Sequence, residues 1–360
     1  MWETEHSYFQ ITIAVNCWHG KIGGVPKHRG PMKSASKVAV GLSSSKRLAW
    51  LLPILFSAAL AAQQAAPSQN NSQLTSDACL QRSIPLTILR LPQDRKLEAK
   101  GLQLFVDGNP TSIFSLRQED IAPRVVMLVD TSGSMFDEEH SPAWELGYLA
   151  SELALETTAP DSPIALVAFD NQVDVSRFQG RNAVSEHLKS MREIRPRGQT
   201  ALYDAVEKSI EIFGPPQFGD TIYIVSDGAD NSSKLGPKVV EGSLIQQGIR
   251  VFAFIVNDVH KKRHTPEDRS GPINLAGLAH STGGNSTVLP MSEAWAKSAD
   301  AAKAARMIAA QVRVPFRLDL QLRDPVIKPV KLKITTSSKD VAFSYPEHIE
   351  PCAAPVANPP

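Results

Sequence analysis

Four short apolar runs, separated by stretches long enough to form a helix, constrain the fold of this chain more than any other feature. The runs contain no charged residue and are rich in β-branched side chains; they are residues 125–129, 164–169, 221–225 and 251–256. Runs of this kind are typical of strands buried on both faces of a sheet. Helices join the parallel strands of such sheets. The spacing therefore predicts an α/β fold, with a doubly wound, mainly parallel, Rossmann-like sheet and helices on both faces.

The segments between the runs carry the apolar spacing of amphipathic helices. One helix is expected after Ser141-Pro142, since a serine cap and a proline in the first turn favour helix initiation. The other expected helices span residues 202–213 and 237–247, the surroundings of 275–279, and 293–312. Together these elements predict a central domain over residues 123–313.

Oxygen-bearing side chains follow two of the apolar runs. The first run ends in Asp130, with Ser132 and Ser134 just beyond it, and the third is followed by Asp227. A polar loop that contains Thr200 opens the helix before the third run. The carboxyl ends of parallel strands meet at one sheet edge, where α/β proteins place ligand sites. Carboxylates and hydroxyls offer only oxygen, which favours Mg²⁺, Mn²⁺ or Ca²⁺ over zinc.

Three segments resemble the von Willebrand factor type A (VWA) domain. They are Asp-Thr-Ser-Gly-Ser at 130–134, Gly-Gln-Thr-Ala-Leu-Tyr-Asp at 198–204 and Val-Ser-Asp-Gly-Ala-Asp-Asn at 225–231. Their order and spacing match the metal ion-dependent adhesion site of that family. The similarity covers roughly residues 124–312 and extends to a bacterial, often exported subgroup with β-structure on both flanks.

The resemblance implies a set of five cation ligands. Carried over to this chain, the ligands are Asp130, Ser132, Ser134, Thr200 and Asp227. The implied cofactor is Mg²⁺, with Mn²⁺ or Ca²⁺ as alternatives. The implied partner is a protein whose Asp or Glu carboxylate completes the coordination of the ion.

The residue pattern favours binding over catalysis. Mg²⁺ holds six oxygens and gives up water reluctantly, so an exposed coordination position attracts an acidic group. A phosphotransferase with an Asp-x-Asp motif would need an acid where Ser132 stands, and neither Gly-x-Ser-x-Gly nor a P-loop is present. We therefore expect a non-enzymatic protein that adheres to a partner in a cation-dependent way. The alternatives are a structural or assembly protein whose metal only stabilises loops and, after it, a metal-dependent hydrolase.

Other residues near the motif have two interpretations each. Asp204 could orient water around the ion or stabilise the first turn of its helix. Asp230 and Asn231 are expected to be loop or capping residues rather than ligands. The segment 258–271 leaves the fourth run on the metal side and is either a contact for an acidic partner or an exposed loop. Its basic cluster begins with His260, Lys261, Lys262 and Arg263.

The amino-terminal segments predict export. Residues 1–31 show no periodicity, are assigned no fold, and could result from a start codon placed too early. Residues 32–62 combine basic residues, about a dozen apolar residues and Ala-Leu-Ala, which indicates a cleaved signal peptide, because a membrane span needs about 20. An uncleaved anchor and an interior helix are the alternatives. Residues 63–78 read as a flexible linker. We expect a periplasmic or secreted protein that meets the membrane only through its signal.

The flanks of the central domain alternate apolar and polar residues. Residues 79–122 and 314–351 are therefore expected to form one small β-subdomain, and residues 352–360 a disordered tail. After export, Cys79 and Cys352 would remain, and an oxidising compartment would allow them to pair. Two free thiols are the alternative.

The overall charge argues against a nucleic-acid partner. The chain has 38 basic and 37 acidic residues, a formal net charge of +1, and only 6% aromatic residues. Nucleic-acid binding needs a basic surface, and binding of single strands usually adds aromatic stacking. We therefore expect no nucleic-acid partner.

Overall fold

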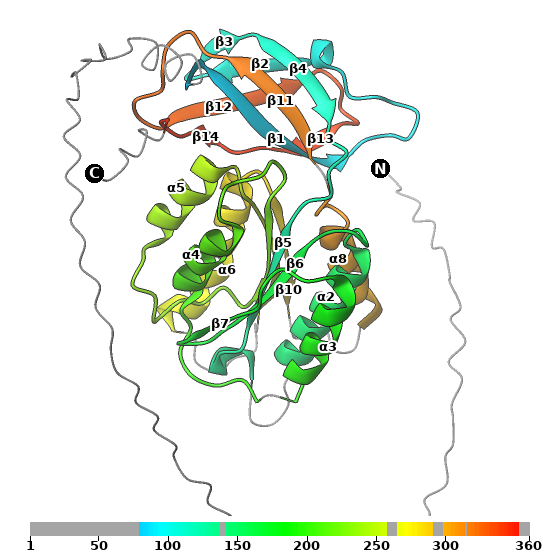
Figure 1. Cartoon of the computed structure of the whole chain (residues 1–360), viewed down its shortest axis with the longest axis vertical. Helices are drawn as coiled ribbons and strands as arrows, with labels where there is room; N and C mark the ends of the chain where they lie inside the picture. The colour runs from blue at the N-terminus through cyan, green and yellow to red at the C-terminus, as the bar shows by residue number, and fades with distance from the viewer. Residues whose placement is uncertain are drawn as a thin grey trace, which may run out of the picture. The chain divides into compact units, whose positions relative to one another are not determined.

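The computed structural model describes residues 79–136, 142–193, 195–257, 265–290, 298–313 and 315–352. These residues form a central α/β domain and a β-sandwich built from both flanks (Figure 1). The predicted fold class is confirmed. None of the helices among these residues has the length and apolar character needed to cross a membrane. Residues 1–31, the predicted signal at 32–62, the predicted linker at 63–78 and the tail beyond Cys352 lie outside the described residues.

The central sheet has six strands in the order β10-β9-β8-β5-β6-β7. The strands are β5 (Val125–Asp130), β6 (Ile164–Phe169), β7 (Val173–Val175), β8 (Thr221–Ser226), β9 (Arg250–Asn257) and β10 (Asn285–Pro290). All neighbouring strands are parallel except β6 and β7. In the middle of the sheet Val129 of β5 lies opposite Val225 of β8, so both strands end at the same edge.

Two strands of this sheet were not predicted. β7 has only three residues, too few for a periodic pattern. β10 begins with Asn285, Ser286 and Thr287, so it lacks the uncharged apolar run that marks the other parallel strands. Both strands lie at the edges of the sheet, where burial constrains the sequence less.

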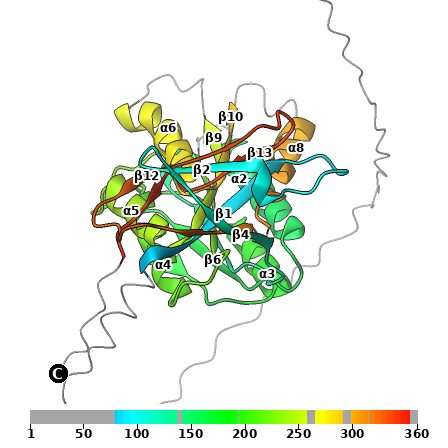
Figure 2. The same ribbon diagram turned by 90° about the horizontal axis from the view of Figure 1, so that it is seen from above.

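Helices cover both faces of the sheet (Figures 1 and 2). The helices are α2 (Pro142–Thr157), α3 (Arg181–Met191), α4 (Leu202–Phe213), α5 (Pro237–Gln247), α6 (Pro266–Ser281) and α8 (Ser298–Ala309). α2, α3 and α8 pack on one face, and α4, α5 and α6 pack on the other. α3 was not predicted. α6 begins before the predicted region, because its polar first turns and the interior Pro272 hide the periodicity.

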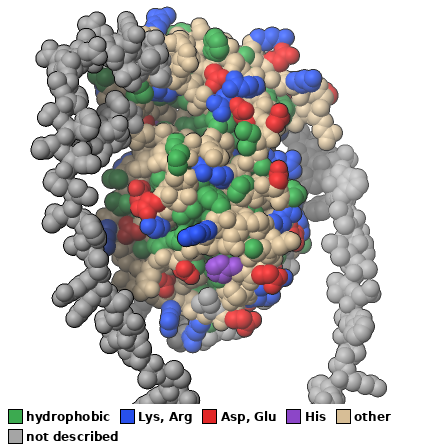
Figure 3. All heavy atoms as spheres, in the orientation of Figure 1, with side chains coloured by type: hydrophobic (Ala, Val, Ile, Leu, Met, Phe, Trp, Pro, Cys, Tyr) green, Lys and Arg blue, Asp and Glu red, His purple; other side chains and the backbone are tan. Residues whose placement is uncertain are grey.

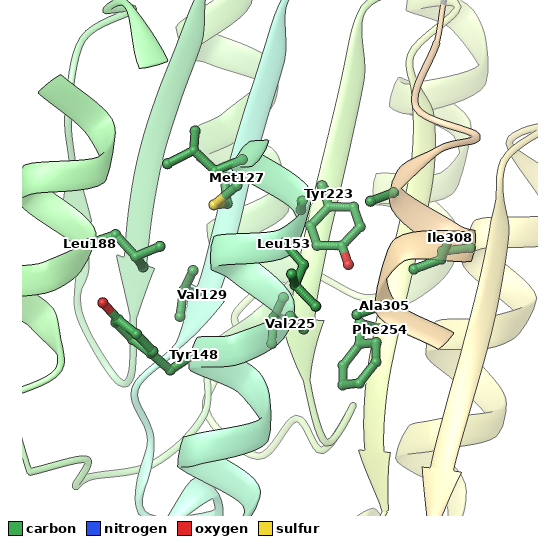
Figure 4. Close-up of a cluster of buried hydrophobic side chains, with 14 of the residues drawn as sticks. Met127, Val129, Tyr148, Leu153, Leu188, Tyr223, Val225, Phe254, Ala305 and Ile308 are labelled. Carbon is green, nitrogen blue, oxygen red and sulfur yellow. The ribbon is translucent and has the colours of Figure 1, made fainter. Parts of the chain in front are cut away.

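The side chains of β5 show why its sequence lacks polar alternation. Met127 and Val129 point to the face covered by α2 and α8, where Figure 4 shows them with Leu153 and Ile308. The intervening Leu128 joins the core on the opposite face. All of these β5 side chains are fully buried. An apolar residue at every position of β5 is therefore required by burial on both faces.

The β-sandwich contains two four-stranded sheets, in the orders β13-β1-β11-β4 and β14-β12-β2-β3. The strands are β1 (Gln81–Arg90), β2 (Leu102–Val106), β3 (Asn109–Thr111), β4 (Ile113–Gln118), β11 (Phe316–Gln321), β12 (Val330–Thr336), β13 (Ala342–Ser344) and β14 (His348–Ile349). Leu86 and Leu318 of one sheet and Leu104 and Leu332 of the other belong to one buried cluster.

The two ends of the sandwich are joined covalently. Cys79 and Cys352 form a disulfide with an S–S distance of 2.03 Å and a Cα–Cα distance of 5.7 Å. The same two flanks pair directly where β1 runs antiparallel to β11. Cys352, the first residue of the tail that was predicted to be disordered, is therefore held in place by this disulfide.

A buried arginine connects the sandwich to the amino-terminal edge of the central sheet. Arg250, at the start of β9, is fully buried, and its Nη1 donates to the hydroxyl of Thr87 in β1 at 3.0 Å. Its Nη2 donates to the hydroxyl of Thr221 at 3.0 Å and to the carbonyl of Arg313 at 2.9 Å. Burial lowers the pKa of Arg250 to about 9, which leaves the guanidinium charged at neutral pH. The sandwich thus contacts the edge opposite the predicted metal ligands.

Candidate metal centre

Asp130 ends β5 at the carboxyl edge of the central sheet. Its side chain is fully buried, and both carboxylate oxygens accept hydrogen bonds. Oδ1 accepts from the backbone N–H of Ser132 at 2.9 Å, and Oδ2 accepts from the hydroxyl of Ser226 at 2.6 Å. Because Ser226 ends the neighbouring strand β8, the pairing of the two strands orients the carboxylate.

The two serines of the motif lie in the turn that follows. Ser132 precedes a short 3₁₀ helix, η2 (Gly133–Met135), which contains Ser134. The Oγ atoms of the two serines are 3.0 Å apart. The turn therefore brings two hydroxyl oxygens together immediately after the buried carboxylate.

The loop that contains Thr200 is held beside this turn by hydrogen bonds from two directions. The N–H of Arg197 donates to the carbonyl of Thr131 at 2.9 Å, and the N–H of Gly133 donates to the carbonyl of Gly198 at 3.1 Å. On the other side, the N–H of Thr200 donates to Oδ1 of Asn231 at 2.9 Å. These bonds join the loops that contain the five predicted ligands.

Asp227 follows β8 and acts on Asp130 through its charge. Burial, and after it the charge of Asp227, raises the pKa of Asp130 to about 7. The hydrogen bonds from Ser132 and Ser226 lower this pKa only partly. Among the described residues, no basic side chain contributes to offsetting the repulsion at Asp130. A buried carboxylate close to a second one favours a bound cation, since a cation would stabilise both charges.

The donor set fits a hard divalent cation. The described residues contain no cluster of three or more His, Cys, Asp or Glu side chains that could hold a metal. A cation among the five predicted residues would instead have two carboxylates, three hydroxyls and water as ligands. Oxygen ligands of this kind suit Mg²⁺, which retains several waters, and they exclude a zinc site of nitrogen and sulfur ligands.

Polar residues of the motif segments that are not proposed ligands hold α4 against the loop after β8. Asp230 Oδ1 accepts from the N–H of Leu202 at 2.9 Å, at the start of α4. The carboxylate of Asp204 accepts from the N–H groups of Lys234 and Leu235 at 3.0–3.1 Å. Asp204 therefore anchors this loop. The Asp-Asn-Ser-Ser string at 230–233 is a capping signal, but it caps a helix that precedes it in the chain.

One predicted group of residues cannot be placed, and one residue of the site was missed by the sequence analysis. The basic cluster of His260, Lys261, Lys262 and Arg263 lies outside the described residues. Ser226, which donates to Asp130, was not singled out from the sequence because a serine at the end of a strand has no distinctive spacing.

Comparison with known proteins finds similarity at the level of structure alone. No model of a protein family matches the chain, and no curated protein matches it. Among solved structures, a von Willebrand factor type A protein from Catenulispora acidiphila is 13% identical, over 73% of this chain and 71% of that chain, with a TM-score of 0.41. The pilus adhesin SpaC from Lactobacillus rhamnosus GG is 10% identical, over 72% of this chain and 48% of that chain, with a TM-score of 0.39. These values are low, so the function is argued from the residues of this chain.

Proposed function

We propose that this protein binds a protein partner through a divalent cation, preferably Mg²⁺. The cation ligands are Asp130, Ser132, Ser134, Thr200 and Asp227, and an Asp or Glu of the partner completes the coordination. One observation carries the proposal: the carboxylate of Asp130 is fully buried, and its ionised form is destabilised by burial and by the charge of Asp227. Burying a charge in this way is costly unless it is paired or coordinates a metal.

Each ligand contributes differently to the bound state. Asp130 and Asp227 supply negative charge, whereas the hydroxyls of Ser132, Ser134 and Thr200 are neutral donors of lone pairs. A carboxylate that contacts the cation only through a bound water molecule neutralises the charge of the cation only in part. A position that faces solvent then favours an acidic group from a partner, which binds with charge and with direction.

Adhesion is favoured over catalysis by the surroundings of the serines. The histidines among the described residues are His187, His280 and His348, and none of them belongs to the loops that carry the ligands. Ser132 and Ser134 bond to each other, and none of these three histidines stands in their loop to activate them. Binding a partner through the cation, unlike catalysis by an activated serine, requires no general base.

Titration calorimetry tests the metal site. MgCl₂ added to chelator-treated protein is expected to bind saturably at one site, and Asp227→Asn should abolish that binding. Asp170→Asn is the matched control: Asp170 follows the neighbouring strand β6, is not a proposed ligand, and should leave Mg²⁺ binding intact. Failure of Mg²⁺, Mn²⁺ and Ca²⁺ to bind the wild-type protein would refute the proposal.

We also infer that the protein is exported. The Cys79–Cys352 disulfide supports this inference, because such bonds persist in oxidising compartments. Expression of the whole chain in a bacterium and mass spectrometry of the periplasmic fraction should find a new amino terminus near Ala61 or Ala62. A cytoplasmic protein with reduced thiols would contradict the inference.

A further inference from the structure

Two arginines lie beside the proposed cation ligands. We use the name arginine rim for Phe136, Arg195 and Arg197. The backbone N–H of Arg197 donates to the carbonyl of Thr131 at 2.9 Å, and Thr131 stands between the proposed ligands Asp130 and Ser132. This bond fixes the backbone of Arg197 next to the loop that carries the first proposed ligands.

The second arginine is positioned by an aromatic ring. The guanidinium carbon of Arg195 lies 4.8 Å from the centre of the Phe136 ring. Phe136 immediately follows η2, the 3₁₀ turn that carries Ser134. A cation–π contact of this kind orients a planar guanidinium and leaves its donors available.

Both guanidinium groups lack an acidic partner within the part of the chain that the structure describes. No ion pair among those residues involves Arg195 or Arg197, and both residues are exposed. Arg192, near the start of the same segment, differs: it pairs with Glu145 at 3.1 Å and lies over the ring of Tyr148 at 5.0 Å. Toward the described residues, the rim therefore presents two arginines without an acidic partner next to the proposed site.

An acidic side chain lies on the Gly198 side of this segment. Oδ2 of Asp170 is 3.5 Å from the position that a Cβ atom at Gly198 would occupy. A partner carboxylate would be repelled there and attracted to the arginines. At the end of the molecule that carries this edge, drawn at the bottom, Figure 3 shows basic side chains interspersed with acidic ones.

We propose that the partner segment carries two acidic residues, one that completes the coordination of the cation and a second that binds the arginine rim. The inference rests on the proposed function and specifies the partner of the same site. Guanidinium groups pair with carboxylates through two parallel hydrogen bonds. In an extended segment, residues two positions apart share a face and lie about 7 Å apart. An acidic residue one to three positions from the first is therefore the expected arrangement.

A peptide array tests the inference with a defined probe. Each nonapeptide carries a central glutamate among serines and glutamines, and a second glutamate is moved through the three positions on either side. Full-length protein is applied in Mg²⁺ or in EDTA. Because the ion pairs are exposed, a well-placed second glutamate should strengthen Mg²⁺-dependent binding by about two- to fivefold, with a decrease at high salt.

Variants separate the rim from the metal site. The double variant Arg195→Gln/Arg197→Gln should lose the gain from the second glutamate and keep Mg²⁺-dependent binding of the single-glutamate peptide. Arg192→Gln, the matched control, should behave as wild type. Asp227→Asn should lose both. If the double variant keeps the gain, or if no position of a second glutamate produces one, the rim proposal is wrong while the metal proposal stands. If no peptide binds in Mg²⁺ and calorimetry detects no bound metal, both proposals are wrong.

Discussion

Replacing Asp130 with asparagine removes a buried charge and preserves the size of the side chain. Burial and Asp227 raise the pKa of Asp130 from 3.8 to about 7. Each pKa unit corresponds to about 1.4 kcal/mol, so the ionised carboxylate costs the metal-free protein about 4 kcal/mol above pH 7. A mismatched hydrogen bond with Ser132 or Ser226 would offset about 1 kcal/mol of the gain. Asp130→Asn is therefore expected to stabilise the metal-free protein by about 3 kcal/mol at pH 8.

The sign of the pH dependence follows from the same shift. The unfolded chain releases the proton of Asp130 near pH 3.8, whereas the folded chain keeps it until about pH 7. The stability of the metal-free wild type should fall as the pH rises between these values and then level off. The advantage of Asp130→Asn should accordingly be larger at pH 8 than at pH 5.

Urea unfolding followed by circular dichroism measures both effects. In EDTA the variant should unfold at a higher urea concentration than the wild type. In saturating Mg²⁺ the wild type should gain about 3 kcal/mol at a hundred times the dissociation constant, and the variant should gain nothing. Asp170→Asn is the control and should respond to Mg²⁺ as the wild type does. A destabilised Asp130→Asn protein in EDTA at pH 8, or one that Mg²⁺ still stabilises, would refute the reasoning.

Three further predictions concern the scaffold, and unfolding measurements check each of them. Gly284→Ala should cost more than about 3 kcal/mol, because its Cβ would lie 1.8 Å from a carbonyl oxygen; Gly277→Ala, with no atom within 4 Å, should be neutral or stabilising. Reducing the Cys79–Cys352 bond, which closes a sequence separation of 273 residues, should cost up to about 5 kcal/mol, and the double serine variant should show no response to reductant. Asp220→Ala should cost about 3–5 kcal/mol, since it leaves the mostly buried guanidinium of Arg124 without its carboxylate partner. An unchanged urea midpoint for Gly284→Ala, for the reduced wild type or for Asp220→Ala would contradict the corresponding prediction.

The sequence predicted the middle of the central sheet and failed at its edges. β5, β6, β8 and β9 are buried on both faces, so nearly every residue is apolar and the pattern is visible locally. β7 and β10 lie at the edges and carry polar residues or are too short. α3 was also missed, although its buried Val184, Leu188 and Met191 have helical spacing.

The proposed ligand set could be derived from the sequence because each residue stands at the end of a recognisable element. The residues that position these ligands through hydrogen bonds could not be derived from the sequence. Ser226 reaches Asp130 across 96 positions, and Asn231 reaches Thr200 across 31. Such hydrogen bonds produce no recognisable pattern in the local sequence around either residue, since they depend on which strands and loops become neighbours in the fold. The arginine rim is similar, because the contact of Arg195 with the ring of Phe136 joins residues 59 positions apart in the chain.

The sequence by itself determined the α/β class, the two-sided burial of the central strands and the oxygen-only chemistry at their carboxyl ends. These features follow from local composition and spacing, and hydrophobic burial constrains the strand residues one by one. Only the tertiary structure decided that Cys79 meets Cys352, that Arg250 is buried against Thr87, and that the buried Asp130 lies close enough to Asp227 for the two charges to interact. Each of these depends on the distance between residues far apart in the chain, and that distance is set by packing.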